Sequence, residues 1–180
     1  MALDHALLVA LRERPASGLE LARRFDRSIG FFWHATHQQI YRVLARMEGD
    51  GWLTAAAVAQ SGRPDKKEYA VSPAGRRVLA EWLAAETPVE PLRSELAVKL
   101  RGASYGGTAG RASVRDLVAR HLGEHHARLA AYHQMVSEQY PHPDRLTGAD
   151  LDRYLVLRGG IRLEEFWVGW LTEYLERTDA

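Results

Sequence analysis

Apolar side chains recur at three- and four-residue steps in the stretch THQQIYRVLARMEGDGWL, residues 36–53: Ile40, Val43, Leu44 and Met47. This period predicts an amphipathic helix with one buried face. Thr36 precedes Gln39 by three residues, the spacing of a capping box at a helix N-terminus. Gly49 and Gly51 follow the apolar stripe, and Gly51 is the better candidate for the left-handed position after the last turn.

Two further helices are predicted before this one. Residues 2–13 place Leu3, Leu7 and Leu11 along one side, and Pro15 ends the helix. A second capping box, Ser17 to Glu20, opens a helix that continues to about residue 27. The intervening loop, residues 29–35, contains three aromatic side chains that we expect to pack in the core: Phe31, Phe32 and Trp33.

The period changes after residue 52. Residues 52–60 and 68–71 suit two short strands, and the turn between them contains Gly62 and Pro64. Ser72 and Pro73 then open a helix to about residue 86, expected to bury four side chains: Val78, Leu79, Trp82 and Leu83. Three helices followed by a hairpin predict a winged helix-turn-helix domain over residues 1–88.

Residues 89–180 are predicted to form a wholly helical second domain. A proline-marked linker at 87–92 leads to a short helix at 92–100 and a glycine-rich loop at 105–111. A long helix over 113–140 carries a heptad seam: Val118, Leu122, His125, Leu129, Tyr132 and Val136. The last helix begins at Thr147 or Asp150 and ends near residue 177, with Gly159 and Gly160 inside it.

We expect these two long helices to pack against the same helices of a second chain, because little local core is available to cover them. The expected contacts of this homodimer lie on the last helix: Leu151, Leu155, Ile161, Trp167, Trp170, Leu171 and Tyr174. The fold class is therefore mostly α, with a winged helix-turn-helix followed by a helical dimerisation domain.

The outer face of the helix at 36–48 carries hydrogen-bond donors and cations: His37, Gln38, Tyr41, Arg42 and Arg46. Such side chains suit the phosphates and base edges of a major groove. Arg63, Lys66 and Lys67 at the expected hairpin tip suit a neighbouring phosphate or the minor groove. The alternatives are an ordinary solvated face, or a winged helix that docks a partner protein without direct contact to DNA.

Composition narrows the class of protein. The net charge is +1, so a nucleic acid must be bound by a local basic patch rather than by overall charge. The chain has no cysteine, no apolar run of about 18 residues and no visible signal peptide. These absences lead us to expect a cytoplasmic protein without a membrane span, a disulfide framework or a thiolate metal site.

The order of elements resembles the PadR family of bacterial transcriptional regulators over essentially the whole chain. The segments that carry the resemblance are QQIYRVLARMEGDGWL (38–53) and GRPDKKEYAVSPAGRRVL (62–79), and the helical second half is similar to the branch with the larger C-terminal domain. The resemblance implies a homodimer that binds a palindromic double-stranded operator and is released by a small molecule.

The resemblance also places particular residues on the DNA. Gln38, Gln39, Tyr41 and Arg42 fall on the DNA-contacting helix, and Arg63, Lys66 and Lys67 fall on the wing. The family often has Gly, Ser or Thr where this chain has Gln38 and Gln39. The operator preference of relatives therefore does not transfer to this chain.

Three other groups of residues could carry chemistry. His121, His125 and His126 could bind a metal ion, but His125 falls on the apolar seam, so seam and surface histidines are the preferred interpretation. Trp167 and Trp170 could form a wall of an effector pocket, although completion of the dimer core is the slightly preferred alternative. The sequence has no nucleophile elbow or phosphate-binding glycine loop, and Glu164 and Glu165 diverge on a helix. We expect no enzyme activity, no cofactor and no metal.

Overall fold

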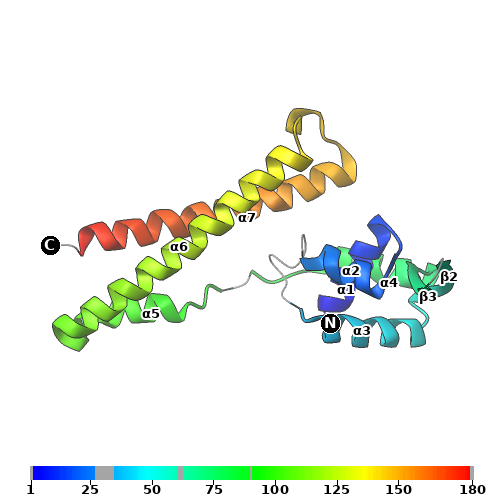
Figure 1. The fold of residues 1–180 in the computed structure, drawn as a ribbon, viewed down its shortest axis with the longest axis horizontal. Coiled ribbons are helices and arrows are strands. Elements are labelled where there is room, and N and C mark those ends of the chain that lie inside the picture. The colour runs from blue at the N-terminus through cyan, green and yellow to red at the C-terminus, as the bar shows by residue number, and fades with distance from the viewer. Residues whose placement is uncertain (1, 27–34, 61–62, 90, 179–180) are drawn as a thin grey trace. The chain divides into compact units, whose positions relative to one another are not determined.

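The computed structural model describes residues 2–26, 35–60, 63–89 and 91–178 of the chain. These residues form two compact units, Met1–Val89 and Glu90–Ala180 (Figure 1). The first unit is a winged helix-turn-helix and the second is helical, which confirms the predicted fold class. In the described part of the chain, no helix combines the length and the apolar character needed to cross a membrane.

The N-terminal unit contains four helices and three strands in the described residues: α1 (Ala2–Glu13), β1 (Ala16–Ser17), α2 (Gly18–Asp26), α3 (His37–Gly49), β2 (Leu53–Gln60), β3 (Arg63–Val71) and α4 (Pro73–Ala84). The strands form an antiparallel sheet in the order β1-β3-β2. Ala16 pairs with Tyr69, and Leu53 pairs with Val71. Strand β1 was not predicted from the sequence, because its two residues are too few to show an alternating pattern.

Local chemistry fixes where the helices begin. The Thr36 hydroxyl oxygen accepts the Gln39 amide, and the Gln39 side chain accepts the Thr36 amide at 2.8 Å, which confirms the predicted capping box. Ser17 and Glu20 make the same reciprocal arrangement at α2. Ser72 caps α4 ahead of Pro73. Gly51 has φ of 73°, the left-handed conformation predicted for it.

The core of this unit lies where α1, α2 and α3 meet the sheet. Its largest fully buried side chains come from the three helices: Leu7, Leu8, Leu11, Leu21, Phe25, Ile40, Leu44 and Met47. Helix α4 contributes Leu79, but Trp82 and Leu83 are exposed, so the prediction that α4 buries them was wrong. The reason is that only one side of α4 packs, against α1 and β3. The predicted aromatic core residues Phe31, Phe32 and Trp33 lie outside the described residues.

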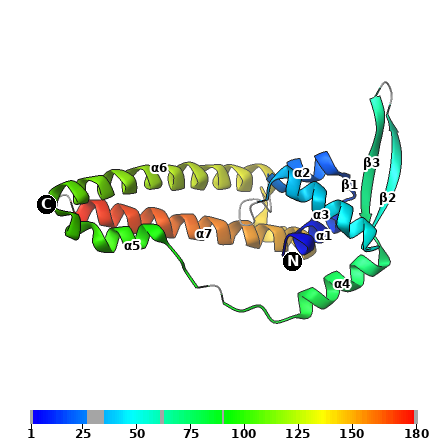
Figure 2. The same cartoon turned by 90° about the horizontal axis from the view of Figure 1, so that it is seen from below.

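The hairpin is longer than predicted, as Figure 2 shows for the wing formed by β2 and β3. Strand β3 begins at Arg63, which pairs with Gln60, whereas the sequence suggested a strand from residue 68. Lys66 and Lys67 pair with Val58 and Ala57 in the body of the hairpin. The prediction that these lysines lie at the hairpin tip was therefore wrong.

The second unit contains α5 (Glu95–Gly102), η2 (Ala103–Gly106), α6 (Gly107–Gln139), η3 (Pro143–Arg145) and α7 (Gly148–Arg177). The glycine-rich stretch 105–111 was predicted as a loop, but it forms the end of η2 and the first turn of α6. Gly107 adopts φ of 63° at the junction, and a Cβ at Gly110 would lie 3.5 Å from the carbonyl oxygen of Ala103. Gly107 thus permits a sharp junction between two helices rather than an irregular loop, whereas Gly110 has room for a larger side chain.

Helices α6 and α7 form an antiparallel hairpin (Figures 1 and 2). Arg115 of α6 donates to the carbonyl of Leu175 near the far end, and Tyr132 lies against Gly160 nearer the connecting loop. The heptad seam of α6 faces inward, with Val118 and Tyr132 buried. Ile161 and Leu171 of α7 are also buried within this single chain. The two helices thus bury only a few apolar side chains within the single chain, which agrees with the expectation that little local core is available to cover them.

Candidate nucleic-acid interface

Helix α3 presents one apolar face and one polar face. Ile40, Leu44 and Met47 are buried against the core, which places the opposite side of the helix in solvent. The exposed residues include every side chain that the sequence proposed for DNA contact on this helix: His37, Gln38, Gln39, Tyr41, Arg42 and Arg46. The first turn contains no acidic residue, so nothing there repels a phosphate.

The polar side chains on the exposed face of α3 fall into two groups: those that bond to other residues of the chain and those that do not. The carbonyl oxygen of the Gln39 side chain accepts the Thr36 amide, so this oxygen serves the cap. Arg46 donates to the buried carboxylate of Asp4 on α1, so its guanidinium connects α3 to α1. Gln38 and Arg42 make no side-chain hydrogen bond or ion pair with any residue that the structure describes. They are therefore the side chains best placed to contact a ligand outside the chain.

Tyr41 lies on the polar face beside the start of α2. A Cβ built on Gly18 would lie 2.4 Å from Cε1 of the Tyr41 ring. Any residue larger than glycine at position 18 would therefore force the ring to move. The ring of Tyr41 is nonetheless about half exposed. Gly18 thus allows the phenol to lie between α2 and α3 with its outer part in solvent.

The two wing lysines have different surroundings. Lys66 Nζ lies 2.9 Å from Glu20 Oε1 and 3.8 Å from Glu68 Oε1, so it connects the wing to α2. The Ser17 amide, and after it the Lys66 side chain, lower the pKa of Glu20 from 4.5 to about 2. Lys67 Nζ lies 2.6 Å from Glu48 Oε2 at the end of α3. The side chain of Arg63 lies outside the described parts of the chain.

The ion pairs of Glu20 with Lys66 and of Glu48 with Lys67 were not predicted from the sequence. Each glutamate lies far along the chain from its lysine, and sequence spacing gives no signal for such pairs. Their effect is to neutralise Lys66 and Lys67 within the molecule. Among the arginines and lysines proposed for DNA contact whose side chains are described, Arg42 is consequently the one without a carboxylate partner.

His125, one of the three histidines proposed as an alternative metal site, has another role in the second unit. His125 Nδ1 lies 2.5 Å from Glu164 Oε2, and Arg128 donates to Glu164 Oε1 at 3.0 Å. Glu164 is buried between α6 and α7, a role that was not predicted from the sequence, in which Glu164 and Glu165 diverge on a helix. Among the described residues, no group of three or more His, Cys, Asp or Glu side chains could hold a metal ion.

Trp167 and Trp170 belong to an aromatic cluster on α7. The Trp167 ring stacks on His125 with centroids 5.2 Å apart, and it lies 5.4 Å from the Trp170 ring. Phe166 contacts both indoles and is half exposed. One part of the cluster, Trp167, thus packs against α6 within the hairpin, and another part, Phe166, is exposed to solvent.

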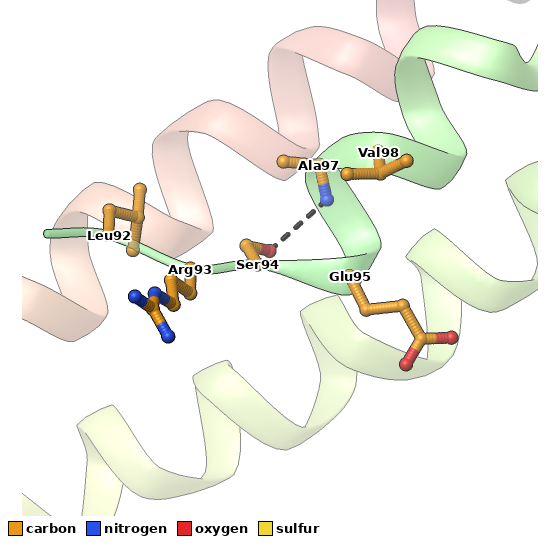
Figure 3. A pocket seen from close by; sticks show the side chains of 6 residues that line it. All are labelled: Leu92, Arg93, Ser94, Glu95, Ala97 and Val98. Carbon is orange, nitrogen blue, oxygen red and sulfur yellow. Dashed lines mark hydrogen bonds between the residues drawn. The ribbon is translucent and has the colours of Figure 1, made fainter.

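A separate open hollow lies at the start of α5, as Figure 3 shows. It is lined by residues from one continuous segment: Leu92, Arg93, Ser94, Glu95, Ala97 and Val98. The Ser94 hydroxyl oxygen accepts the Ala97 amide at 3.1 Å and caps the helix. Neither Trp167 nor Trp170 lines this hollow, so it does not correspond to the pocket expected from the sequence.

Comparisons with known proteins agree with this geometry. Residues 7–81 match the transcriptional regulator PadR-like family, and residues 92–179 match the family described as virulence activator alpha C-term. The chain is 49% identical to the probable transcriptional regulator Rv1176c of Mycobacterium tuberculosis, over 98% of this chain and 97% of that protein.

Two solved structures are similar over nearly their whole length. Bacillus subtilis PadR in complex with operator DNA is 27% identical, with a TM-score of 0.85, over 99% of this chain and 100% of that one. The Vibrio cholerae virulence activator AphA is 30% identical, with a TM-score of 0.78, over 97% and 96% of the two chains. Bacillus subtilis PadR has also been solved with p-coumaric acid.

These matches cover both units of the chain, and the N-terminal one coincides with the helix-turn-helix and wing described above. They also confirm that the chain is a regulator rather than an enzyme. The chain belongs to the PadR-like family of DNA-binding transcriptional regulators.

Proposed function

We propose that the protein is a ligand-responsive repressor that binds a palindromic operator as a homodimer and acts in the cytoplasm. The observation that carries this proposal is the exposed face of α3, where Gln38 and Arg42 make no side-chain hydrogen bond or ion pair with any described residue and Tyr41 is half exposed. In the major groove, Gln38 would contact a base edge, and Arg42 and Tyr41 would contact the backbone or a base.

Dimerisation is proposed through the C-terminal hairpin. Four apolar side chains of α7 are more than half exposed in the single chain: Leu155, Val156, Leu163 and Phe166. Trp170 and Tyr174 are partly buried on the same helix. A second hairpin that covers these residues would remove a large apolar surface from water. The resulting symmetric dimer would place two α3 helices about 34 Å apart, one turn of DNA.

The effector is proposed to be a small aromatic acid or a related phenolic compound. Support comes from Bacillus subtilis PadR, which has been solved with p-coumaric acid, and from the aromatic cluster that contains Trp167 and Trp170. A ligand that binds one arrangement of the dimer more tightly than the DNA-binding arrangement lowers operator affinity by that difference in affinity.

DNA recognition is tested by selecting genomic fragments with the purified protein and measuring affinities for the selected operator. Arg42→Ala should weaken binding to every duplex and lower the slope of log affinity against log salt by about 1. Gln38→Ala should relax preference at one base position, at a cost of about 1–3 kcal/mol. If both variants bind the operator as the parent does, α3 does not contact the DNA.

Dimerisation is tested with two substitutions on α7. Phe166→Asp places a charge on the exposed surface and should yield a helical monomer by light scattering and circular dichroism. Leu171→Asp is the matched comparison: its side chain is buried inside the chain, so it should unfold the hairpin instead. A Phe166→Asp variant that remains a dimer would place the interface elsewhere.

The effector is tested with a panel of phenolic acids and a variant that retains only Trp167 and Trp170, with the other tryptophans replaced by Phe. A true effector should quench the remaining fluorescence and release the operator over the same concentration range. Quenching without release would identify a binding site that does not control the DNA.

A further inference from the structure

Three cations of the candidate DNA interface contact carboxylates of the same unit. Arg46 contacts Asp4 of α1, Lys66 contacts Glu20 of α2, and Lys67 contacts Glu48 of α3. Each pair joins different elements, so none is a simple pair between adjacent helical turns. The pairs differ in how accessible they are to a phosphate from outside.

The first two carboxylates, those of Asp4 and Glu20, are held in place by the fold of the N-terminal unit. Asp4 is buried. Glu20 accepts hydrogen bonds from both the amide and the hydroxyl of Ser17, so it caps α2 as well as contacting Lys66. Release of Arg46 or Lys66 to a phosphate would therefore remove a partner from a carboxylate that the unit holds in place.

The Lys67–Glu48 pair is the accessible one. The side chains of Lys67 and Glu48 are 53% and 33% exposed, and the Glu48 carboxylate makes no other side-chain hydrogen bond or ion pair among the described residues. The Lys67 ammonium also lies 5.4 Å from the centre of the Tyr69 ring, which keeps it beside the wing whether or not Glu48 is its partner. Both members can therefore exchange partners with little change to the fold.

We propose that Glu48 competes with DNA phosphate for Lys67 and thereby limits the phosphate-driven part of DNA binding. This inference rests on the proposed function, because it assumes that the α3 face and the wing contact DNA. A free lysine would neutralise one phosphate and release its condensed counterion. While Lys67 is paired with Glu48, the lysine does not contact the phosphate. If Lys67 moves to the phosphate, the Glu48 carboxylate is left close to the DNA without its partner.

The hydrogen bond from Lys67 to Glu48 also raises the pKa of Lys67 from its ordinary value, which agrees with a close pair. Replacement of Glu48 with glutamine retains the shape of the side chain but removes the charge that competes with phosphate. The structure therefore predicts a gain of DNA affinity from this substitution, rather than a loss.

The test uses the full-length protein, a selected operator and a random duplex. Glu48→Gln should raise affinity for both duplexes by up to about fivefold, and it should steepen the salt dependence by about 0.9. Asp50→Asn is the matched control, because it makes the same change in net charge two residues further along on an exposed side chain. It should alter affinity less and leave the salt slope unchanged.

A double-mutant cycle identifies the mechanism. In a Lys67→Ala background, Glu48→Gln should have no larger effect than Asp50→Asn, because no lysine remains to be released. An NMR titration of the Lys67 side chain supplies a readout without DNA: its pKa should fall in Glu48→Gln and not in Asp50→Asn.

Two outcomes overturn the inference in distinguishable ways. If the parent binds the operator but Glu48→Gln behaves as Asp50→Asn does in both backgrounds, the competition is refuted while the proposed function stands. If neither the parent nor any variant binds a duplex, the proposed function fails and this inference fails with it.

Discussion

Replacement of Arg46 with alanine should destabilise the N-terminal unit rather than remove a phosphate contact. The guanidinium donates to Asp4, whose side chain is only 7% exposed, whereas the Arg46 side chain is 54% exposed. A hydrogen bond to a charged group contributes about 1.5–3 kcal/mol when it is buried. Because water screens the exposed end of this pair, we expect a loss of about 1–2 kcal/mol.

The expected loss is large enough to measure. For a domain of roughly 90 residues, about 1 kcal/mol lowers Tm by roughly 4–8 °C. Thermal unfolding of Arg46→Ala should therefore shift down by roughly 5–15 °C. Arg42→Ala is the control on the same face of α3, and its unfolding free energy should stay within about 0.5 kcal/mol of the parent.

A second substitution tests the cause. Asp4→Asn in the Arg46→Ala background should recover part of the stability, because a buried amide costs less than a buried carboxylate from which the Arg46 charge has been removed. An Arg46→Ala variant that unfolds as the parent does, while its salt slope for DNA binding falls by about 1, would contradict this expectation. That result would mean that Arg46 contacts phosphate and that its pair with Asp4 contributes nothing to the fold.

Three further substitutions test single contacts. Gly18→Ala should push the Tyr41 ring out of place, and fluorescence anisotropy should then show weaker operator binding with little change in Tm, since the ring can rotate into solvent. Gly75→Ala should destabilise by about 1–3 kcal/mol or more in denaturant unfolding, because its Cβ would lie 2.2 Å from the carbonyl oxygen of Trp52. The pKa of Glu20 is lowered to about 2, so its stabilising contribution is complete above about pH 4.5 and is lost as pH falls toward 2. Glu20→Gln should flatten this part of the pH dependence of unfolding, and an unchanged profile would contradict the assignment.

The elements that the sequence predicted well are those set by neighbouring residues. The capping boxes at Thr36 and Ser17 and the left-handed Gly51 each depend on side chains within a few positions, so they are visible in the sequence. Strand β1 was missed because it exists only by pairing with β3, more than 50 residues later. The stretch 105–111 was misassigned because glycine lowers helix propensity, and here tertiary packing outweighs that preference.

In the candidate site, too, only the features that depend on neighbouring residues could be predicted from the sequence. Exposure of Gln38 and Arg42 follows from the helical period, because the opposite face carries the apolar stripe. The helical period does not predict the carboxylate partners of Arg46 and Lys66. Arg46 and Asp4 are 42 positions apart, and Lys66 and Glu20 are 46 positions apart, so only the folded chain shows that these cations are already neutralised.

The buried carboxylate of Glu164 also constrains how the C-terminal hairpin can move. It accepts from Arg128 and contacts His125, which lie three positions apart on α6. Sliding α7 by one helical turn, about 5.4 Å, would separate the carboxylate from both partners and leave a charge buried between apolar side chains. Axial slippage of one helix past the other is therefore opposed, and we expect any movement of this hairpin to displace or rotate both helices together.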